Sequence, residues 1–358
     1  MKKILQISMM LFSLKGFAQT DSTQMQFYIS GYVETYYSYD FSKPDNHSKA
    51  GFMYSHNKHN EFNLNLGFIK VGYQTEKVRA NLALATGTYM NANYAAEAGV
   101  MKNIYEANAG VKISKKQEVW IDAGIMSSHL GFESAVGKDN WTVTRGIYAE
   151  NSPYFETGAK ISYTTSNSKW MISALLLNGW QRIQRVDGNN TPSFGHQLVY
   201  KPNSKITLNS SSFIGNDKPD SIKQMRYFHN LYGIFQINDK FGITAGFDLG
   251  AEQKSKGSSN YNYWYTPVVI AKYSPTAKQN VAIRLEYFSD ENGIIIGTGT
   301  SNGFKTWGYS FNYDYLIREN VMWRIEGRGF NSKDKIFIKD GNPINNNFFI
   351  TTSIAIGI

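Results

Sequence analysis

Two groups of charged side chains in this sequence have the types and spacing to act on ions. The first group alternates along two short segments near the end of the chain, so its members share one face of an extended backbone: Arg284, Glu286, Arg324, Glu326 and Arg328. The second group lies in the long irregular stretch Ser127 to Tyr154, which carries Glu133, Lys138, Asp139, Arg145 and Glu150. Guanidinium and carboxylate groups that face each other across water select ions and small polar solutes by charge.

The positions of these charges predict that the two groups meet inside a bore. Arg284 and Arg324 lie at similar distances from short turns, which predicts that they lie at similar height. Because long structured loops are usually functional, we expect Ser127 to Tyr154 to fold inward and to narrow the bore. The alternative is an ordinary external loop beside ion pairs that neutralise each other on the wall. Other charged side chains predicted to line the bore are Glu34, Arg79 and Arg226.

Three histidines that could form a metal site, His47, His56 and His59, lie in the first long connection. Three imidazoles are able to bind a transition metal. No carboxylate or cysteine spacing supports such a site, however, and Lys49 and Lys58 lie beside the histidines. We therefore interpret this segment as a solvated polar loop and predict no bound metal.

The sequence also predicts no enzyme and no cofactor. The glycine-rich run 297–303 lacks the third glycine of a dinucleotide-binding loop, and no helix is expected after it. His129 and His196 lie in or beside expected strands, but no serine, histidine and acid are grouped closely enough to indicate a catalytic triad. No catalytic residue is assigned.

The elements that must position the charges are strands, and the end of the chain shows them most clearly. Large apolar residues alternate there with smaller or weakly polar ones, at Phe348, Ile350, Ile354, Ile356 and Ile358. A period of two indicates a strand with one apolar face and one polar face. The chain ends on this strand, as a membrane-spanning β-barrel does when its last strand closes against its first.

The first expected strand, Phe27 to Phe41, has the same two faces, and Glu34 lies on the polar one. A carboxylate facing hydrocarbon would cost several kcal/mol, so this face must line the interior. The second expected strand, Glu61 to Gln74, starts with four apolar residues expected to point outward, namely Phe62, Leu64, Leu66 and Phe68. Lys70 breaks that alternation and suggests a β-bulge.

The alternation continues along the chain and predicts an antiparallel barrel of about 16 strands. Short turns and long connections follow each other in strict order, with short turns such as 75–77, 114–117 and 238–240. An even number of strands places both termini of the chain on the periplasmic side, with short periplasmic turns and long extracellular loops. A soluble β-sandwich has many short strands too, but nothing forces its connections into this order.

Composition agrees with such a barrel and excludes other classes. The 358 residues are 42% hydrophobic and 15% aromatic, with a mean hydropathy of −0.39, and no stretch of 18 uncharged apolar residues could form a membrane helix. The formal net charge is +9, but the basic residues are spread out, so nucleic-acid binding is not predicted. The sequence has no cysteine, so disulfides play no part.

Residues 1–18 have the features of a secretory signal peptide. Lys2 and Lys3 precede the apolar run 4–14, and Gly16 and Ala18 place small residues at the positions that a signal peptidase reads. We expect cleavage before Gln19, which leaves residues 19–358 as the outer-membrane barrel.

Three segments resemble the putative β-barrel porin-2 (OmpL-like) family of outer-membrane proteins. They are 31–37 (GYVETYY), 144–158 (TRGIYAENSPYFETG) and 176–181 (LLNGWQ), and the middle one is the most specific. The resemblance extends over the whole expected mature chain. It implies a porin-like protein of the outer membrane and offers no catalytic set.

These observations predict a passive outer-membrane channel for small hydrophilic solutes or ions, surrounded by outer-membrane lipid. One alternative is a substrate-specific channel, for example for sugars, in which Tyr28, Tyr32 and Tyr36 stack on rings. Another is a closed barrel that acts as a surface receptor or adhesin. The sequence leaves assembly into a homo-oligomer open.

Overall fold

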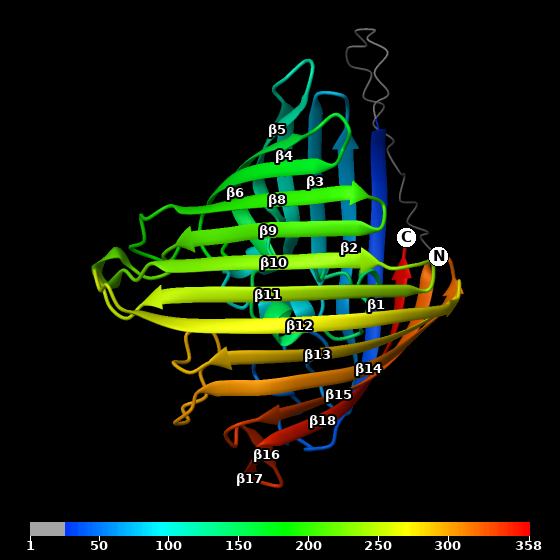
Figure 1. Cartoon of the computed structure of the whole chain (residues 1–358), viewed down its shortest axis with the longest axis vertical. Coiled ribbons are helices and arrows are strands. Elements are labelled where there is room, and N and C mark those ends of the chain that lie inside the picture. Colours follow the sequence, from blue (N-terminus) through cyan, green and yellow to red (C-terminus); the bar gives the residue numbers. More distant parts are fainter. Residues whose placement is uncertain (1–25) are drawn as a thin grey trace, which may run out of the picture.

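The computed structural model describes residues 26–358, and within them sixteen strands close into one antiparallel barrel (Figure 1). Neighbours in sequence are neighbours in the ring, and β18 closes it against β1. The predicted fold and strand number are confirmed, while the predicted signal peptide lies outside the described residues. The barrel strands are β1 (Gln26–Asp40), β2 (Phe62–Gln74), β3 (Val78–Thr86), β4 (Ile104–Lys112), β5 (Glu118–Ser127), β6 (Phe155–Thr164), β7 (Trp170–Leu177), β8 (Ser193–Asn203), β9 (Ile206–Gly215), β10 (Arg226–Gln236), β11 (Phe241–Gln253), β12 (Tyr261–Thr276), β13 (Gln279–Asp290), β14 (Phe304–Arg318), β15 (Val321–Ser332) and β18 (Asn346–Gly357).

A few short elements interrupt the long connections. A small hairpin precedes the last barrel strand, and the helical pieces are one or two turns long. Among residues 26–358, no helix is long and apolar enough to cross a membrane. The short elements are β16 (Phe337–Lys339), β17 (Asn342–Ile344), α1 (Thr88–Asn93), α2 (Ile147–Glu150), η1 (Gly99–Asn103), η2 (Gly137–Asp139) and η3 (Asp220–Ile222).

The last residue of the chain takes part in closing the barrel. Ile358 N donates to Gly31 O at 2.8 Å, and Gly31 N donates to Ile358 O at 2.9 Å. Ile350 and Ile354 point outward and are exposed. Ala355, which pairs in register with Glu34 of β1, points inward and is buried. The terminal strand therefore has the two predicted faces, and its apolar face belongs to the outer surface of the ring.

The connections at the two ends of the barrel differ in length, as expected from the sequence. One end carries only tight turns, such as those between β2 and β3 and between β10 and β11, and we call it the short-turn end. The other end carries the long connections, including 41–61, 87–103, 128–154 and 333–345, and we call it the long-loop end.

The inner and outer faces of β2 differ from the prediction because of a bulge at Asn65. Glu34 pairs with Leu66 and Thr35 with Leu64, so Asn65 is the extra residue. Beyond the bulge the alternation is inverted: Leu66 is fully buried, and Lys70 lies on the inner face in an ion pair with Glu106 of β4. The predicted outward orientation of Leu66 and Phe68 is therefore wrong, and the bulge precedes Lys70 by five residues.

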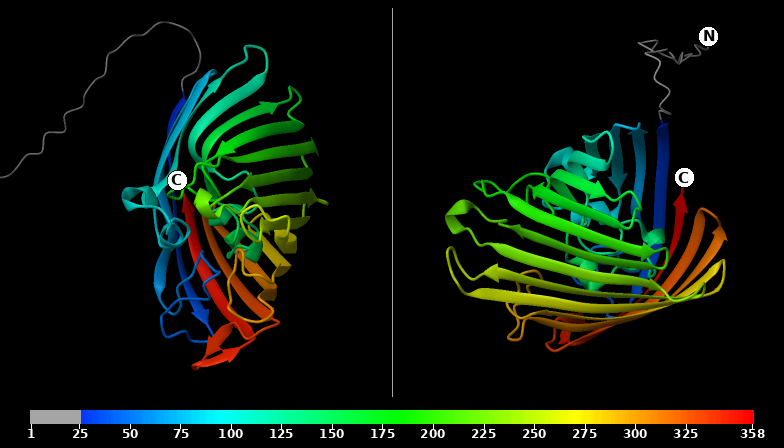
Figure 2. Two further views of the ribbon diagram at one scale, coloured as in Figure 1. Left: turned by 90° about the vertical axis from the view of Figure 1, so that its left-hand side faces the viewer. Right: turned by 45° about the horizontal axis from the view of Figure 1, so that its top comes forward.

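The interior of the barrel is occupied by chain. Sixteen strands enclose more space than the inward side chains can fill. Two long connections, 41–61 and 128–154, and helix α1 enter this space, and Figure 2 shows chain inside the ring of strands in both views. Their apolar residues form a buried cluster with wall residues, which includes Leu66, Tyr89, Tyr94, Tyr148, Tyr154, Val268 and Ile270.

Candidate functional site in the barrel interior

Residues 128–154, which we call the inner segment, connect β5 to β6 and cross the bore. On one side, Lys138 N donates to the hydroxyl of Tyr32 on β1 at 3.3 Å. On another, Gly131 N donates to the side-chain oxygen of Asn230 on β10 at 3.2 Å. Because these two strands lie in different parts of the ring, the inner segment spans the interior between them.

Three arginines on the wall hold the backbone of the inner segment. Arg284 Nη1 donates to Thr144 O at 2.7 Å, and Arg328 Nη1 donates to Arg145 O at 2.5 Å. Arg324 Nη1 donates to Gly137 O at 2.6 Å, and its Nη2 donates to the carbonyl of Asn140 at 2.9 Å. Hydrogen bonds from a charged donor are stronger than neutral ones, so β13 and β15 fix the path of this segment firmly.

Two wall carboxylates complete the attachment. Glu326 Oε2 accepts hydrogen bonds from Thr144 N at 2.6 Å and from its hydroxyl at 2.7 Å. Glu286 Oε2 accepts from Ile147 N at 2.5 Å. We call Arg284, Glu286, Glu326 and Arg328 the Arg–Glu cluster, since its members also pair with each other: Glu326 with Arg284 at 2.9 Å and Glu286 with Arg328 at 2.5 Å.

The Arg–Glu cluster is dry and balanced in charge. All four side chains are fully buried, with two positive and two negative groups. A buried charge without a partner is strongly unfavourable, so these four groups depend on each other and on the inner segment. The cluster therefore serves to anchor the inner segment and does not border open water.

The charges of the inner segment mostly find partners elsewhere than predicted. Glu133 is the one predicted loop carboxylate that approaches a predicted wall guanidinium, at 3.6 Å from Arg284. Arg145 is fully buried and donates to carbonyls of its own segment, at Ser134, Ala135 and Val143. Glu150 accepts from the backbone of Tyr54 and Ser55 in the first long loop, and Asp139 pairs with Lys138 at an exposed position.

The strand register places the wall arginines relative to each other. Arg284 pairs with Ser310, and Ser310 pairs with Arg328. Arg324 pairs with Asp314, four residues nearer to the short-turn end along β15. Across β14, Arg284 is therefore in register with Arg328 and not with Arg324.

The three remaining predicted bore residues lie apart from the Arg–Glu cluster. Glu34 is buried on β1 and accepts from Asn65 Nδ2 at 2.9 Å. Arg79 pairs with Asp122 of β5 near the short-turn end, with its guanidinium 4.2 Å from the centre of the Trp120 ring. Near the long-loop end, Arg226 pairs with two acids, Glu252 at 2.6 Å and Asp217 at 3.4 Å.

The histidines of the first long loop point to different partners. His56 Nε2 lies 3.2 Å from Glu34 Oε1, and both side chains are fully buried. His59 Nδ1 accepts a hydrogen bond from the backbone of Asp40 at 2.8 Å. His47 lies beside His59, with ring centres 6.3 Å apart. The prediction of a solvated loop is therefore wrong for His56 and His59, which are buried inside the barrel.

Two of the three tyrosines proposed for ring stacking are covered, whereas Tyr28 is 41% exposed and its hydroxyl donates to Asn81 Oδ1 at 3.0 Å. Tyr32 and Tyr36 are buried, with only 1% and 2% of their surface exposed. The Tyr36 hydroxyl is hydrogen-bonded to Thr88 and accepts from Lys58 N. These two tyrosines hold the inner segment and the first long loop, so they are not available to a sugar ring.

Aromatic residues of the inner segment form a contact that the sequence analysis missed. Phe132 packs on Tyr148 at 4.9 Å and on Tyr232 of β10 at 5.5 Å. The ammonium of Lys272 on β12 lies over the Trp141 ring, 4.5 Å from its centre, in a cation–π contact. The sequence carries a signal for this packing, because aromatic residues in a stretch rich in polar residues indicate a segment that is partly buried. They border a cavity of about 60 Å³, lined by Phe132, Glu133, Asp139, Asn140, Trp141, Ile234, Thr244 and Ile270.

Larger cavities lie on both sides of the inner segment. Towards the long-loop end, a cavity of about 340 Å³ is bordered by Glu150, Trp180 and Arg226. Towards the short-turn end, a cavity of about 400 Å³ is bordered by Tyr32, Lys138 and other residues of β1, β2 and β18. The inner segment thus separates two wide spaces, and the 60 Å³ cavity beside it has room for about two waters.

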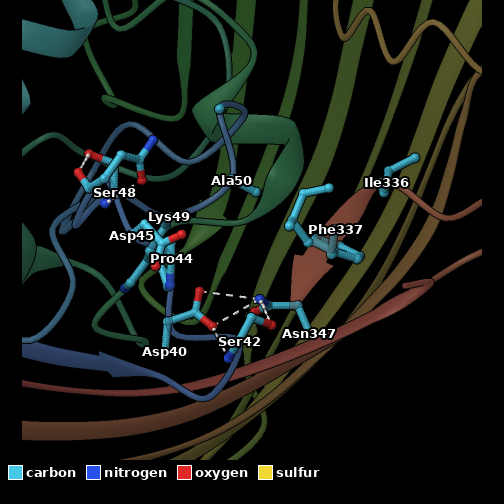
Figure 3. Close-up of a pocket in the computed structure, with 13 residues that line it drawn as sticks. Asp40, Ser42, Pro44, Asp45, Ser48, Lys49, Ala50, Ile336, Phe337 and Asn347 are labelled. Carbon is cyan, nitrogen blue, oxygen red and sulfur yellow. Dashed lines mark hydrogen bonds between the residues drawn. The ribbon is translucent and has the colours of Figure 1, made fainter. Parts of the chain in front are cut away.

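The first long loop and the β16–β17 hairpin meet over the long-loop end (Figure 3). Asn347 Nδ2 donates to the Asp40 carboxylate at 3.0 Å, and Ser42 N donates to the same group at 2.8 Å. Phe337 of the hairpin packs on Phe330 of β15 with ring centres 6.0 Å apart. A cavity of about 410 Å³ remains between the loop and the hairpin.

Lys49 extends from the first long loop into the interior. Its ammonium donates to the Thr351 hydroxyl at 3.1 Å and lies 3.8 Å from the centre of the Phe349 ring. Burial lowers the pKa of Lys49 to about 7, against the opposing effect of the nearby Asp40 carboxylate. The charge of this side chain therefore changes within the ordinary range of external pH.

Comparisons with known proteins agree with the barrel. A family model described as "Putative beta-barrel porin-2, OmpL-like" matches residues 26–358. No match was found among curated proteins.

Solved structures share the fold at low sequence identity. The anion-selective porin from Comamonas acidovorans is similar with a TM-score of 0.61 and 9% identity, covering 94% of this chain and 100% of that one. The trimer form of OmpT from Vibrio cholerae gives 0.62 and 9%, covering 93% and 99%. The channel DcaP of Acinetobacter baumannii gives 0.58 and 10%, covering 93% and 97%.

Proposed function

Because the chain belongs to the putative beta-barrel porin-2, OmpL-like, family and is a porin of the outer membrane, we propose that it passes small hydrophilic solutes or ions passively through a bore that the inner segment narrows. Transport of this kind involves no catalysed reaction, and we assign none. Outer-membrane lipid surrounds the apolar outer face, and the long-loop end faces the cell exterior.

The attachment of the inner segment carries this proposal. A segment held by Arg284, Arg324 and Arg328 keeps its position under solute flow, and a fixed constriction sets an upper size for solutes. We expect solutes to pass the two wide cavities and the small one in series along the bore. We therefore expect a low single-channel conductance for a barrel of sixteen strands.

Planar bilayer recordings test the proposal directly. Deleting residues 137–147 removes the hydrogen bonds of Arg324 and Arg284 to the inner segment, and should raise the single-channel conductance several-fold. A matched deletion of residues 255–258, at the exposed tip of the β11–β12 connection, should leave the conductance unchanged. Equal conductance of the wild type and the 137–147 deletion would overturn the constriction.

The same recordings separate a general pore from a selective one. Current that is linear in salt concentration supports passive diffusion, whereas saturable and stereoselective flux supports a specific channel. Reversal potentials in a salt gradient give the ion preference.

A closed barrel that acts as a surface receptor is the second candidate. It is favoured by the contacts of the inner segment on β1, β10, β13 and β15, which leave little free space at that height. Such a barrel would show no conductance as wild type and would conduct only after the 137–147 deletion.

We also propose that residues 1–18 direct export and are removed, and that the barrel assembles with further copies of itself. Intact mass measurement of protein purified from outer membranes tests the first point, since cleavage before Gln19 gives a defined mass. Light scattering in detergent tests the second.

A further inference from the structure

Four polar side chains gather on the outer face of β8, β9 and β10. Ser212 pairs in register with His196 on one side and with His229 on the other. The Ser212 hydroxyl lies 2.5 Å from His196 Nδ1, and the Ser210 hydroxyl lies 3.2 Å from His229 Nε2. The two imidazole rings are 5.8 Å apart. We call these four residues the outer polar cluster.

Apolar side chains frame this cluster on the same surface. Phe194, Ile214 and Tyr227 point outward one step nearer the long-loop end, each with about 40–50% of its surface exposed. Leu208 and Leu231 point outward towards the short-turn end. On the neighbouring β11 every outward residue from Phe241 to Leu249 is apolar. The cluster therefore lies within the belt that faces hydrocarbon, where a polar group without a partner is unfavourable.

The hydrogen bonds inside the cluster leave polar groups unused. His196 uses Nδ1 and His229 uses Nε2, so each ring presents its other nitrogen. A neutral imidazole has one donor and one acceptor, and a serine hydroxyl can act as both. Lipid tails satisfy neither, so a partner with polar groups at this depth is needed.

We propose that the outer polar cluster is the contact between copies of this chain, and that the rotation axis of the assembly passes beside it. This inference rests on the proposed self-assembly and assigns it to one surface. All copies insert in the same orientation, so a rotation axis normal to the membrane brings their clusters together at equal depth. The donors and acceptors then satisfy each other without any charged group.

The surroundings of the cluster allow close approach. Ala174 pairs in register with His196, and Gly233 pairs with Ala245, so small outward residues lie on both sides. Small residues let two membrane proteins bring their polar groups within hydrogen-bond distance. Leu176 and Phe247 add exposed apolar surface at the margin.

The absence of native cysteine makes disulfide cross-linking a clean test. With Ser212→Cys, oxidation in isolated outer membranes should convert most of the protein to a cross-linked dimer. Val33→Cys is the matched control, since Val33 is an outward residue of β1, on the opposite side of the ring. Equal cross-linking of the two variants would overturn the assignment.

Light scattering in detergent tests two points separately: whether the chain assembles with copies of itself, and whether the outer polar cluster is the contact. The wild type should have the mass of an oligomer, and the double variant His196→Leu/His229→Leu should have the mass of a monomer with an unchanged β-barrel circular dichroism spectrum. A monomeric wild type would refute the assembly, and an oligomeric double variant would refute this contact. Neither result depends on conductance, so a failure of the channel proposal is recognised separately.

Discussion

Arg284 on β13 and Glu326 on β15 form an ion pair of 2.9 Å that reaches across β14, and neither side chain is exposed. Both also bind Thr144 of the inner segment. The pair thus joins two strands of the wall to the chain inside the barrel.

Replacing Glu326 by alanine should destabilise the barrel by about 3–5 kcal/mol, because Arg284 then remains buried without its ion-pair partner. Urea unfolding in lipid, followed by tryptophan fluorescence, measures the difference. Glu291→Ala is the control, since Glu291 pairs with Lys305 at the surface and its loss should change little. Equal effects of the two substitutions would contradict the anchoring role.

Replacing Arg324 by glutamine should loosen the part of the inner segment nearest the short-turn end. The substitution removes the charged donor to Gly137 O and Asn140 O and leaves the neighbouring Asp314 without its partner. Hydrogen exchange of residues 137–140 should become at least tenfold faster. Arg79→Gln removes a wall ion pair that does not touch the inner segment, so it should leave exchange there unchanged.

Truncating Trp141 should widen the narrow cavity. Its ring borders the 60 Å³ space together with Thr244 and Ile270, and Trp141→Ala removes the largest side chain of that boundary. Single-channel conductance should rise, and larger neutral solutes should pass in liposome swelling measurements. Trp307→Ala is the control, because Trp307 faces outward on β14. An unchanged conductance in Trp141→Ala would place the solute path elsewhere.

The charge of Lys49 should make the stability of the wild type depend on pH. Its pKa is about 7 in the folded protein and near the ordinary value of 10.5 in the unfolded chain, so between these values the unfolded chain binds more protons. Stability should therefore rise with pH in this range, by at most about 1.4 kcal/mol per pH unit, and be lowest below pH 7. In Lys49→Met this contribution is absent. The free energy of unfolding of the wild type, measured relative to that of Lys49→Met, should therefore rise from pH 7 to 10. A constant difference would contradict the burial of a titrating ammonium.

The sequence was sufficient to predict the barrel because its signals are local. The alternation at Ile350 and Ile354, the carboxylate of Glu34 and the order of short and long connections each depend on neighbouring residues only. The fold follows from them without knowledge of any distant contact. The strand number and the closure of β18 on β1 followed in the same way.

The interior was harder to predict because it depends on register and on distant partners. One extra residue at Asn65 inverts the faces of β2; the broken alternation at Lys70 indicates a bulge but does not mark its position. The register of Arg284 with Arg328 follows from their shared pairing with Ser310, which distances from turns do not give. Arg145 was predicted to act at the constriction; its hydrogen-bond partners are carbonyls of its own segment, which side-chain types do not reveal.

The partners of the inner segment are contributed by the last third of the chain. Thr144 meets Arg284, Glu326 and Arg328, which follow it by 140 to 184 residues. During assembly Thr144 lacks these charged partners until β13 to β15 are in place, and such distant contacts form late. The final strands therefore have two roles in assembly: they close the ring, and they fix the inner segment in its place across the bore.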